Sequence, residues 1–253
     1  MRIPFTDWHI PLGRLIGPLV SAVPKRAVLP IIQGPARGIR WLVGSGMHNF
    51  WLGTYEPEKY ELFSKELVAG MVVYDIGANT GIYTVLACRS VGADGRVFAF
   101  EPATTNLSYL YENIRANRFV NCEVIPKAVS NSDGSVRFEF AGESCLGRIS
   151  VDGLLRVASI SLDSFVSSGK PMPHLLKIDV EGAEYDVLTG ATRVLLQAKP
   201  TIFLATHGEK VHADCCGMLE KLGYTLRILA PDELIARFPS GAEGAKVSPS
   251  EAR

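Results

Sequence analysis

The stretch VVYDIGANTGIYT, residues 72–84, decides the fold, because an apolar run here ends in an acid and two glycines and then turns helical. A continuous apolar run, rather than strict alternation, is typical of a strand buried on both faces. Gly77 permits a sharp backbone turn where this run stops. The order strand, glycine turn, helix predicts the first unit of a parallel α/β sheet, with a ligand site at the carboxyl end of the strand.

The same alternation continues along the chain. Strands are predicted at residues 71–76, 96–101, 122–129, 175–180, 201–207 and 224–229. Helices are predicted between them, at residues 80–91, 103–117, 184–197 and 210–222. This order predicts a Rossmann-like α/β fold, a mostly parallel sheet with helices on both faces. Between residues 136 and 166 the short pieces FEF and ASISL predict an inserted hairpin or an edge extension.

The chain divides into three zones. Residues 1–60 are rich in Pro, Gly and Trp, and we expect a helical arm, with helices around 35–43 and 57–69, that packs on or near an acceptor site. Residues 61–238 form the ligand-binding domain. Residues 239–253 are small and polar, which predicts a disordered tail.

Charge is balanced overall but uneven along the chain. Lys plus Arg and Asp plus Glu both total 26 in 253 residues, which disfavours a nucleic-acid partner. Residues 1–50 carry six basic residues against one acid. Such an arm could contact an anionic membrane surface peripherally, or it could be a packed layer with solvated charges.

Cysteine usage and hydropathy bear on location. Five cysteines without a CxxC pair favour reduced thiols in a cytoplasmic protein. No stretch reaches the roughly 18 consecutive apolar residues of a spanning helix. We therefore expect a cytoplasmic protein, with any membrane contact limited to residues 1–50.

The glycine spacing bears on the cofactor. A dinucleotide fingerprint needs glycine at position 79, where Asn79 stands instead. Asp75, two residues before Gly77, would repel a diphosphate but would suit the sulfonium of S-adenosylmethionine. Glu101 ends the second strand, where a carboxylate can accept both ribose hydroxyls. The sequence therefore favours S-adenosylmethionine over NAD. The residues expected to contact it follow the first three strands: Asp75, Gly77, Ala78, Asn79, Gly81, Tyr83, Glu101, Pro102, Ala128 and Val129.

Six stretches resemble the FkbM-type methyltransferases: LGTYE (52–56), VVYDIGANTGIYT (72–84), GRVFAFEPATTNLSYLYENIRAN (95–117), KAVSNSDG (127–134), KIDVEGAEYDVLTGA (177–191) and KLGY (221–224). The resemblance covers residues 50–228. It implies a class I methyltransferase fold, S-adenosylmethionine as donor, and O-methylation of a small-molecule or glycan acceptor, such as a sugar, glycolipid or natural product. The chain departs from the family pattern at Ala205, where the resemblance implies Glu; this change could alter the acceptor, reduce activity or be structural only.

The chemical groups are expected at the ends of the fourth and fifth strands. Asp179 ends the fourth strand, with Lys177 two residues earlier on the same side, and His207 closes the fifth. We expect Asp179 to orient the acceptor or the cofactor amine, with Asp179 or His207 as proton acceptor. Glu181 and Glu184, three residues apart, are candidate acceptor contacts.

Structural roles stay open for three of these residues. Lys177 could serve only in an ion pair, His207 could be a hydrogen-bonded strand-end histidine, and Glu184 could be a helix-start acid. A divalent metal between Asp179, Glu181 and His207 is disfavoured, because Ala205 and Thr206 stand where a neighbouring acid would be needed, so no metal is expected. Two other readings are a non-catalytic docking protein that keeps the fold and an NAD-dependent oxidoreductase.

Overall fold

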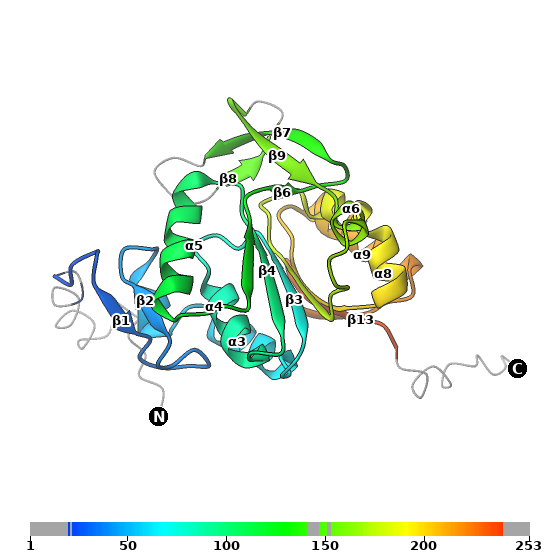
Figure 1. Ribbon diagram of the computed structural model, residues 1–253. Coiled ribbons are helices and arrows are strands. Elements are labelled where there is room, and N and C mark those ends of the chain that lie inside the picture. The colour runs from blue at the N-terminus through cyan, green and yellow to red at the C-terminus, as the bar shows by residue number, and fades with distance from the viewer. Residues whose placement is uncertain (1–19, 21, 141–146, 151–152, 240–253) are drawn as a thin grey trace, which may run out of the picture.

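The computed structural model describes residues 20, 22–140, 147–150 and 153–239. Its centre is a seven-stranded sheet with the order β12-β13-β11-β10-β3-β4-β5 (Figure 1). The strands are β3 (Val72–Ile76), β4 (Arg96–Phe100), β5 (Cys122–Ile125), β10 (Leu175–Ile178), β11 (Thr201–Ala205), β12 (Thr225–Ala230) and β13 (Glu233–Arg237). All pairs from β11 to β5 are parallel, and both pairs of β13 are antiparallel. The predicted mostly parallel, Rossmann-like sheet is confirmed.

Helices cover both faces of this sheet, as predicted (Figure 1). Successive side chains of a strand point to opposite faces. Val73 accordingly packs with the helices of one face, and Tyr74 and Ile76 pack with those of the other. The first face holds α3 (Pro57–Glu66), α4 (Ile82–Val91) and α5 (Thr104–Ala116). The second holds α6 (Leu162–Ser167), α7 (Glu184–Thr189), α8 (Thr192–Ala198) and α9 (Glu209–Lys221).

A second, four-stranded sheet lies at the top of Figure 1, with the order β6-β9-β7-β8. It comprises β6 (Ala128–Val129), β7 (Gly134–Phe140), β8 (Gly147–Ile149) and β9 (Leu155–Ile160). The inserted hairpin predicted in this region is confirmed, because β7 pairs antiparallel with β8 and with β9. The alternative of an edge extension is wrong, because these strands form a sheet separate from the central one. The strand predicted at 122–129 is divided, because its last two residues leave β5 to pair with β9.

The described part of the arm is more β-structured than predicted. β1 (Val28–Pro30) and β2 (Arg40–Leu42) pair antiparallel, so the helix expected at 35–43 is wrong. Trp41, fully buried, packs edge-on against Phe50 at 5.8 Å, and this burial favours the extended strand. The helix expected at 57–69 is α3, and a short helix, α2 (His48–Leu52), precedes it.

Side-chain amides of α5 fasten the arm to the domain. Asn113 accepts a hydrogen bond from the Leu42 N–H at 2.9 Å, and Asn117 accepts one from the Arg40 N–H at 2.8 Å. Since Asn113 also donates to the Thr80 carbonyl at 2.9 Å, one side chain connects β2 to the turn after β3. The arm therefore lies close to the expected ligand site.

Two further details differ from the sequence predictions, and a third prediction falls mostly outside the described residues. β12 is antiparallel to a short strand, β13, that the sequence did not predict. The helix expected at 184–197 is two helices, α7 and α8, separated by Gly190 and Ala191. Gly190 packs closely, since a Cβ there would lie 2.2 Å from the Ser130 carbonyl oxygen. The tail predicted at 239–253 lies, from residue 240 on, outside the described residues.

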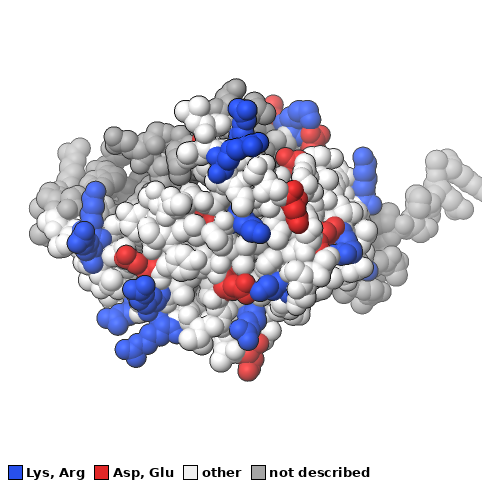
Figure 2. All heavy atoms as spheres, turned by 45° about the horizontal axis from the view of Figure 1, so that its top comes forward, with Lys and Arg blue, Asp and Glu red and all other residues white. Residues whose placement is uncertain are grey.

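Charges of both signs are mixed over the face shown in Figure 2. The basic arm residues that the structure describes, Lys25, Arg26, Arg37 and Arg40, are exposed. Their contact with an anionic surface stays a prediction. Over the described residues, no helix combines the length and the apolar character needed to cross a membrane.

Candidate active site

The turn after β3 is held in left-handed backbone conformations. Gly77, Asn79 and Gly81 have φ values of 76°, 51° and 99°. Glycine is needed at position 77 for a second reason, since a Cβ there would lie 1.9 Å from the Asp179 carbonyl oxygen. The close approach is therefore to the end of β10 and brings Asp179 next to the turn. Asn79 adopts the left-handed region that Asn tolerates better than most residues.

Glu101, at the end of β4, is fixed against this turn. It is 4% exposed and accepts hydrogen bonds from the Asn79 and Ala103 N–H groups, each at 2.8 Å. Burial raises the pKa of Glu101, and these hydrogen bonds oppose that shift. The carboxylate is thus preorganised at the carboxyl edge of the sheet, where the sequence predicts a ribose contact.

A cavity opens above these residues, at the carboxyl ends of β3, β4 and β10. Eight of the predicted cofactor contacts line it: Gly77, Ala78, Asn79, Tyr83, Glu101, Pro102, Ala128 and Val129. Asp75 and Gly81 do not. Further lining residues come from the arm (Phe50, Tyr55), from the second sheet (Phe138, Ile149) and from Lys127 just before β6. Tyr55 and Lys127 lie in the stretches LGTYE and KAVSNSDG but were not expected to contact a ligand. Phe50, Phe138 and Ile149 carry no motif, so only their general place beside the site could be predicted.

Asp75 is completely buried and does not line the cavity. Its Oδ2 accepts a hydrogen bond from Thr84 Oγ1 at 2.6 Å, and its Oδ1 lies 3.3 Å from Lys177 Nζ. Burial alone would lower the pKa of Lys177, but Asp75 and Asp179 outweigh it and the pKa is raised. Lys177 also donates to the Gly77 carbonyl at 2.8 Å. Asp75 therefore acts on the cavity through Lys177, and the ion-pair reading of Lys177 matches this geometry.

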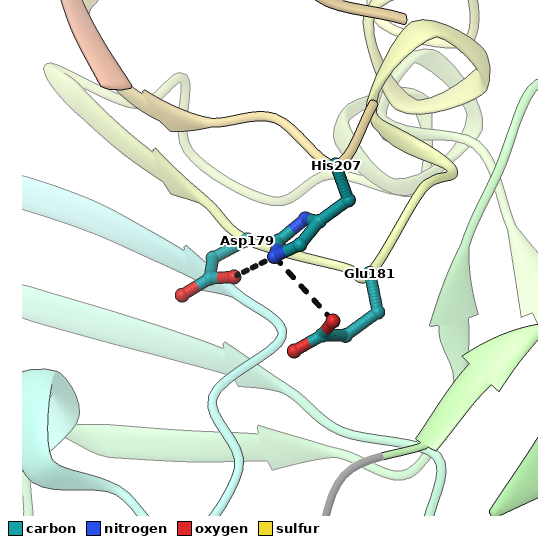
Figure 3. Close-up of side chains that lie close together, drawn as sticks. All are labelled: Asp179, Glu181 and His207. Carbon is teal, nitrogen blue, oxygen red and sulfur yellow. Dashed lines mark ion pairs between the residues drawn. The ribbon is translucent and has the colours of Figure 1, made fainter. Parts of the chain in front are cut away.

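Asp179 and Glu181 follow β10, His207 follows β11, and the three side chains come together (Figure 3). Asp179 and Glu181 line the cavity, and His207 lies beside them. His207 Nε2 lies 3.4 Å from a Glu181 oxygen and 3.9 Å from an Asp179 oxygen. Asp179 also lies 3.6 Å from Lys177 Nζ. Burial would raise the pKa of Asp179, but Lys177 and the other nearby cations outweigh it, so the pKa is lowered and the group is ionised.

Glu184 holds the imidazole of His207 through a hydrogen bond. It has no exposed surface, and its Oε1 lies 2.8 Å from His207 Nδ1 and accepts from the Gly182 N–H at 3.0 Å. Because a carboxylate only accepts, Nδ1 carries the hydrogen and Nε2 faces Asp179 and Glu181. Glu184 lines neither the cavity nor the neighbouring cleft, so it is placed to position His207 rather than to touch an acceptor.

These contacts make His207 a cation at neutral pH. The pKa of His207 is raised to about 9. The hydrogen bond with Glu184 is the largest cause, burial lowers the pKa, and the nearby carboxylates Glu181, Glu184 and Asp179 raise it further. A protonated imidazole accepts no further proton. Of the two proton acceptors that the sequence left open, the geometry favours Asp179.

An open cleft adjoins the cavity. Its lining residues are Ile149, Ser150, Glu181, Gly182, Thr206, His207, Gly208 and Asp232. Glu181 and Ile149 line both spaces, so the cavity and the cleft meet beside Asp179. The structure therefore has two adjoining spaces at the carboxyl edge of the central sheet.

Ala205, the departure from the family pattern, ends β11 directly opposite Glu233 in β13. Side chains of directly opposed residues share one face of a sheet. Glu233 therefore supplies a carboxylate next to position 205, where it pairs with Lys59 at 2.7 Å. The sequence missed this acid because β13 was not predicted.

The fold and the two adjoining spaces define a class I methyltransferase domain. The family profile of the Methyltransferase FkbM domain matches residues 75–226, which is more than half of the chain. The protein belongs to the FkbM methyltransferase family, and S-adenosylmethionine is the cofactor expected in its cavity. The family assignment argues against the NAD-dependent alternative.

Two known proteins are similar to this chain. Hexuronic acid methyltransferase AglP of Haloferax volcanii is 33% identical over 145 residues, which cover 55% of this chain and 58% of AglP. The crystal structure of methyltransferase FkbM from Methylobacillus flagellatus KT has a TM-score of 0.53 and 22% identity, over 76% of this chain and 52% of that one. The chain thus spans little more than half the length of either protein.

Proposed function

We propose that the protein transfers a methyl group from S-adenosylmethionine to a hydroxyl group of a sugar-containing acceptor. The observation that carries this proposal is the meeting of the cavity and the polar cleft at Glu181, beside the ionised Asp179. The name of the relative AglP supports a sugar as the acceptor. The polar lining of the cleft, with Thr206, His207 and Asp232, suits a polyhydroxylated ligand.

The residues of the cavity fit the proposed cofactor. S-adenosylmethionine supplies a methyl group that is already activated on a sulfonium. Glu101 offers its remaining lone pairs to the ribose hydroxyls, and the turn at Gly77–Thr80 lines the space beside it. Asp179 and Glu181 give the acceptor end of the cavity a negative lining that favours a cation.

The acceptor hydroxyl is positioned and deprotonated by the strand-end groups. Asp179 is placed to take the proton of the acceptor hydroxyl, and S-adenosylmethionine, when bound, would supply the activated methyl group to the hydroxyl oxygen. Lys177 keeps Asp179 ionised before the reaction. His207, held by Glu184, offers a hydrogen-bond donor to a neighbouring acceptor oxygen.

Two measurements test this proposal. Calorimetric titration with S-adenosylhomocysteine should give one site per chain, and labelled methyl transfer to a panel of sugars and uronic acids should give an alkali-stable ether. Alkali-labile label on uronic acids alone would mean carboxyl rather than hydroxyl methylation. Binding of the cofactor product without transfer to any acceptor would favour the docking-protein reading, and no binding at millimolar ligand would defeat the proposal.

A further inference from the structure

We infer that Asp179, Glu181 and His207 form a binding site for a divalent transition-metal ion where the cavity meets the cleft. Each residue offers one ligand atom, and these three atoms lie within 4.8 Å of one another. Two carboxylates and one imidazole form a mixed set that suits Mn²⁺ or Zn²⁺ better than Mg²⁺, which prefers oxygen ligands alone. Figure 3 shows the three side chains pointing toward one shared space.

The separations of the ligand atoms fit an ion between them. With bonds of about 2.1 Å, two ligand atoms at a tetrahedral angle lie about 3.4 Å apart. His207 Nε2 lies 3.4 Å from Glu181 Oε2 and 3.9 Å from Asp179 Oδ1. Small side-chain rotations at these partly exposed positions would complete the set, so the backbone need not move.

Glu184 supplies an independent argument. Histidines that bind metals almost always donate their other ring N–H to a carboxylate, a backbone carbonyl or a water, which fixes the tautomer and directs the lone pair at the ion. Glu184 Oε1 takes this position at 2.8 Å from His207 Nδ1, and the N–H of Gly182 holds it there. The buried Glu184 would then serve as the outer partner of a metal-bound imidazole.

The net charge of the side chains around this site is negative, which favours binding of a cation. Four carboxylates, Asp75, Asp179, Glu181 and Glu184, are linked by ion pairs to Lys177 and His207 only, among the pairs seen in the described residues. Even with His207 protonated, two negative charges are left uncompensated within this group. Buried or half-buried charges need a partner, and a divalent ion between three of these residues would supply it.

The position of the site indicates its use, and this step rests on the proposed function. Glu181 and His207 line the cleft, so the coordination positions of the ion on that side would be open to an acceptor. An ion there would replace the proton on His207 Nε2 and would hold an acceptor hydroxyl next to Asp179, where it would lower the pKa of that hydroxyl. The absence of an acid at Ala205 disfavoured a metal in the sequence, but the sequence could not show that the ligand atoms of Asp179, Glu181 and His207 lie within 4.8 Å of one another.

Binding can be tested without turnover. The full chain, stripped with a chelator, would be titrated with MnCl₂ under electron paramagnetic resonance and with ZnCl₂ by calorimetry, in the absence of cofactor. One ion per chain is expected. His207→Ala and Asp179→Asn should each weaken binding at least about tenfold, and Glu184→Gln should weaken it by about 10–100-fold, the usual effect of an outer partner.

The matched control is Asp232→Asn. Asp232 lines the same cleft but lies outside the three-residue set, so its loss should leave the affinity unchanged. Asp179→Asn keeps the side-chain shape and decides the matter if His207→Ala fails to fold. Absence of Mn²⁺ and Zn²⁺ binding at millimolar ion, or equal weakening by Asp232→Asn, would overturn the inference. A parallel titration with S-adenosylhomocysteine separates the two ideas, because cofactor binding without ion binding defeats only the metal site.

Discussion

Lys177 lies directly opposite Asp75 in the register of β10 and β3, with its Nζ 3.3 Å from Asp75 Oδ1. Both side chains are almost completely buried, at 5% and 0% exposed. The same ammonium donates to the Gly77 carbonyl and lies 3.6 Å from Asp179. One buried cation therefore joins the strand of the cofactor turn to the strand that carries the proposed proton acceptor.

We expect Lys177→Met to destabilise the fold by about 3–5 kcal/mol, because it leaves Asp75 buried without its cation. Urea denaturation followed by circular dichroism measures this loss. The double variant Asp75→Asn with Lys177→Met should recover part of it, since the two residues are in contact and their effects are coupled. A loss below about 1 kcal/mol, the range of a surface pair, would mean that this ion pair is not the buried connection described.

Glu101→Gln should weaken the binding of S-adenosylhomocysteine. The change retains shape but replaces an acceptor that holds the Asn79 and Ala103 N–H groups, so we expect a loss of about 1–3 kcal/mol in binding free energy. Calorimetry on the variant gives the value. Glu112→Gln, at an exposed position of α5, is the control and should bind as the parent does. Equal affinity for both variants would remove Glu101 from the proposed cofactor site.

The central sheet could be predicted because its signals are local. Each of β3, β4 and β10 is a mostly apolar run followed by a turn and a helix, as burial on both faces requires, and the charged residues Asp75 and Lys177 pair with each other between β3 and β10. The sequence did not predict β2 and β13, because the extended conformation of these residues depends on tertiary contacts. Arg40–Leu42 is extended where Trp41 packs beneath Phe50, and Glu233–Arg237 is a strand because β11 and β12 lie on either side.

The site was predictable to the extent that strand ends converge. Glu101, Asp179 and His207 each lie at the carboxyl end of a predicted strand, and the carboxyl edge of a parallel sheet brings such residues together. The sequence could not show that Asp75 faces Lys177, since this depends on the register of β3 with β10. It also could not show that Tyr55 and Ile149 line the cavity, because they come from segments without a periodic pattern.

Asp179→Asn should separate binding from turnover. The amide keeps the side-chain volume but cannot accept the hydroxyl proton, so we expect turnover to fall by about 10²–10⁴-fold. Affinity for S-adenosylhomocysteine should change little, because Asp179 lies at the acceptor end of the cavity. Single-turnover methyl transfer, measured beside a calorimetric titration, distinguishes the two effects. A fully active variant would assign the proton to another group.

Gly77→Ala and Gly70→Ala form a matched pair that tests the approach of β10 to the cofactor turn. Both glycines have positive φ, 76° and 83°, so each alanine should cost about 1–2 kcal/mol in backbone strain. A Cβ at Gly70 meets nothing within 4 Å, whereas a Cβ at Gly77 would lie 1.9 Å from the Asp179 carbonyl oxygen.

Gly77→Ala should therefore lose more stability than Gly70→Ala in thermal unfolding, and only Gly77→Ala should also weaken S-adenosylhomocysteine binding, because the turn and Asp179 must move apart. Equal losses in both variants would mean that backbone strain accounts for the whole effect. In that case the ends of β3 and β10 would have room for a methyl group between them, and the placement of Asp179 beside the turn would not depend on Gly77.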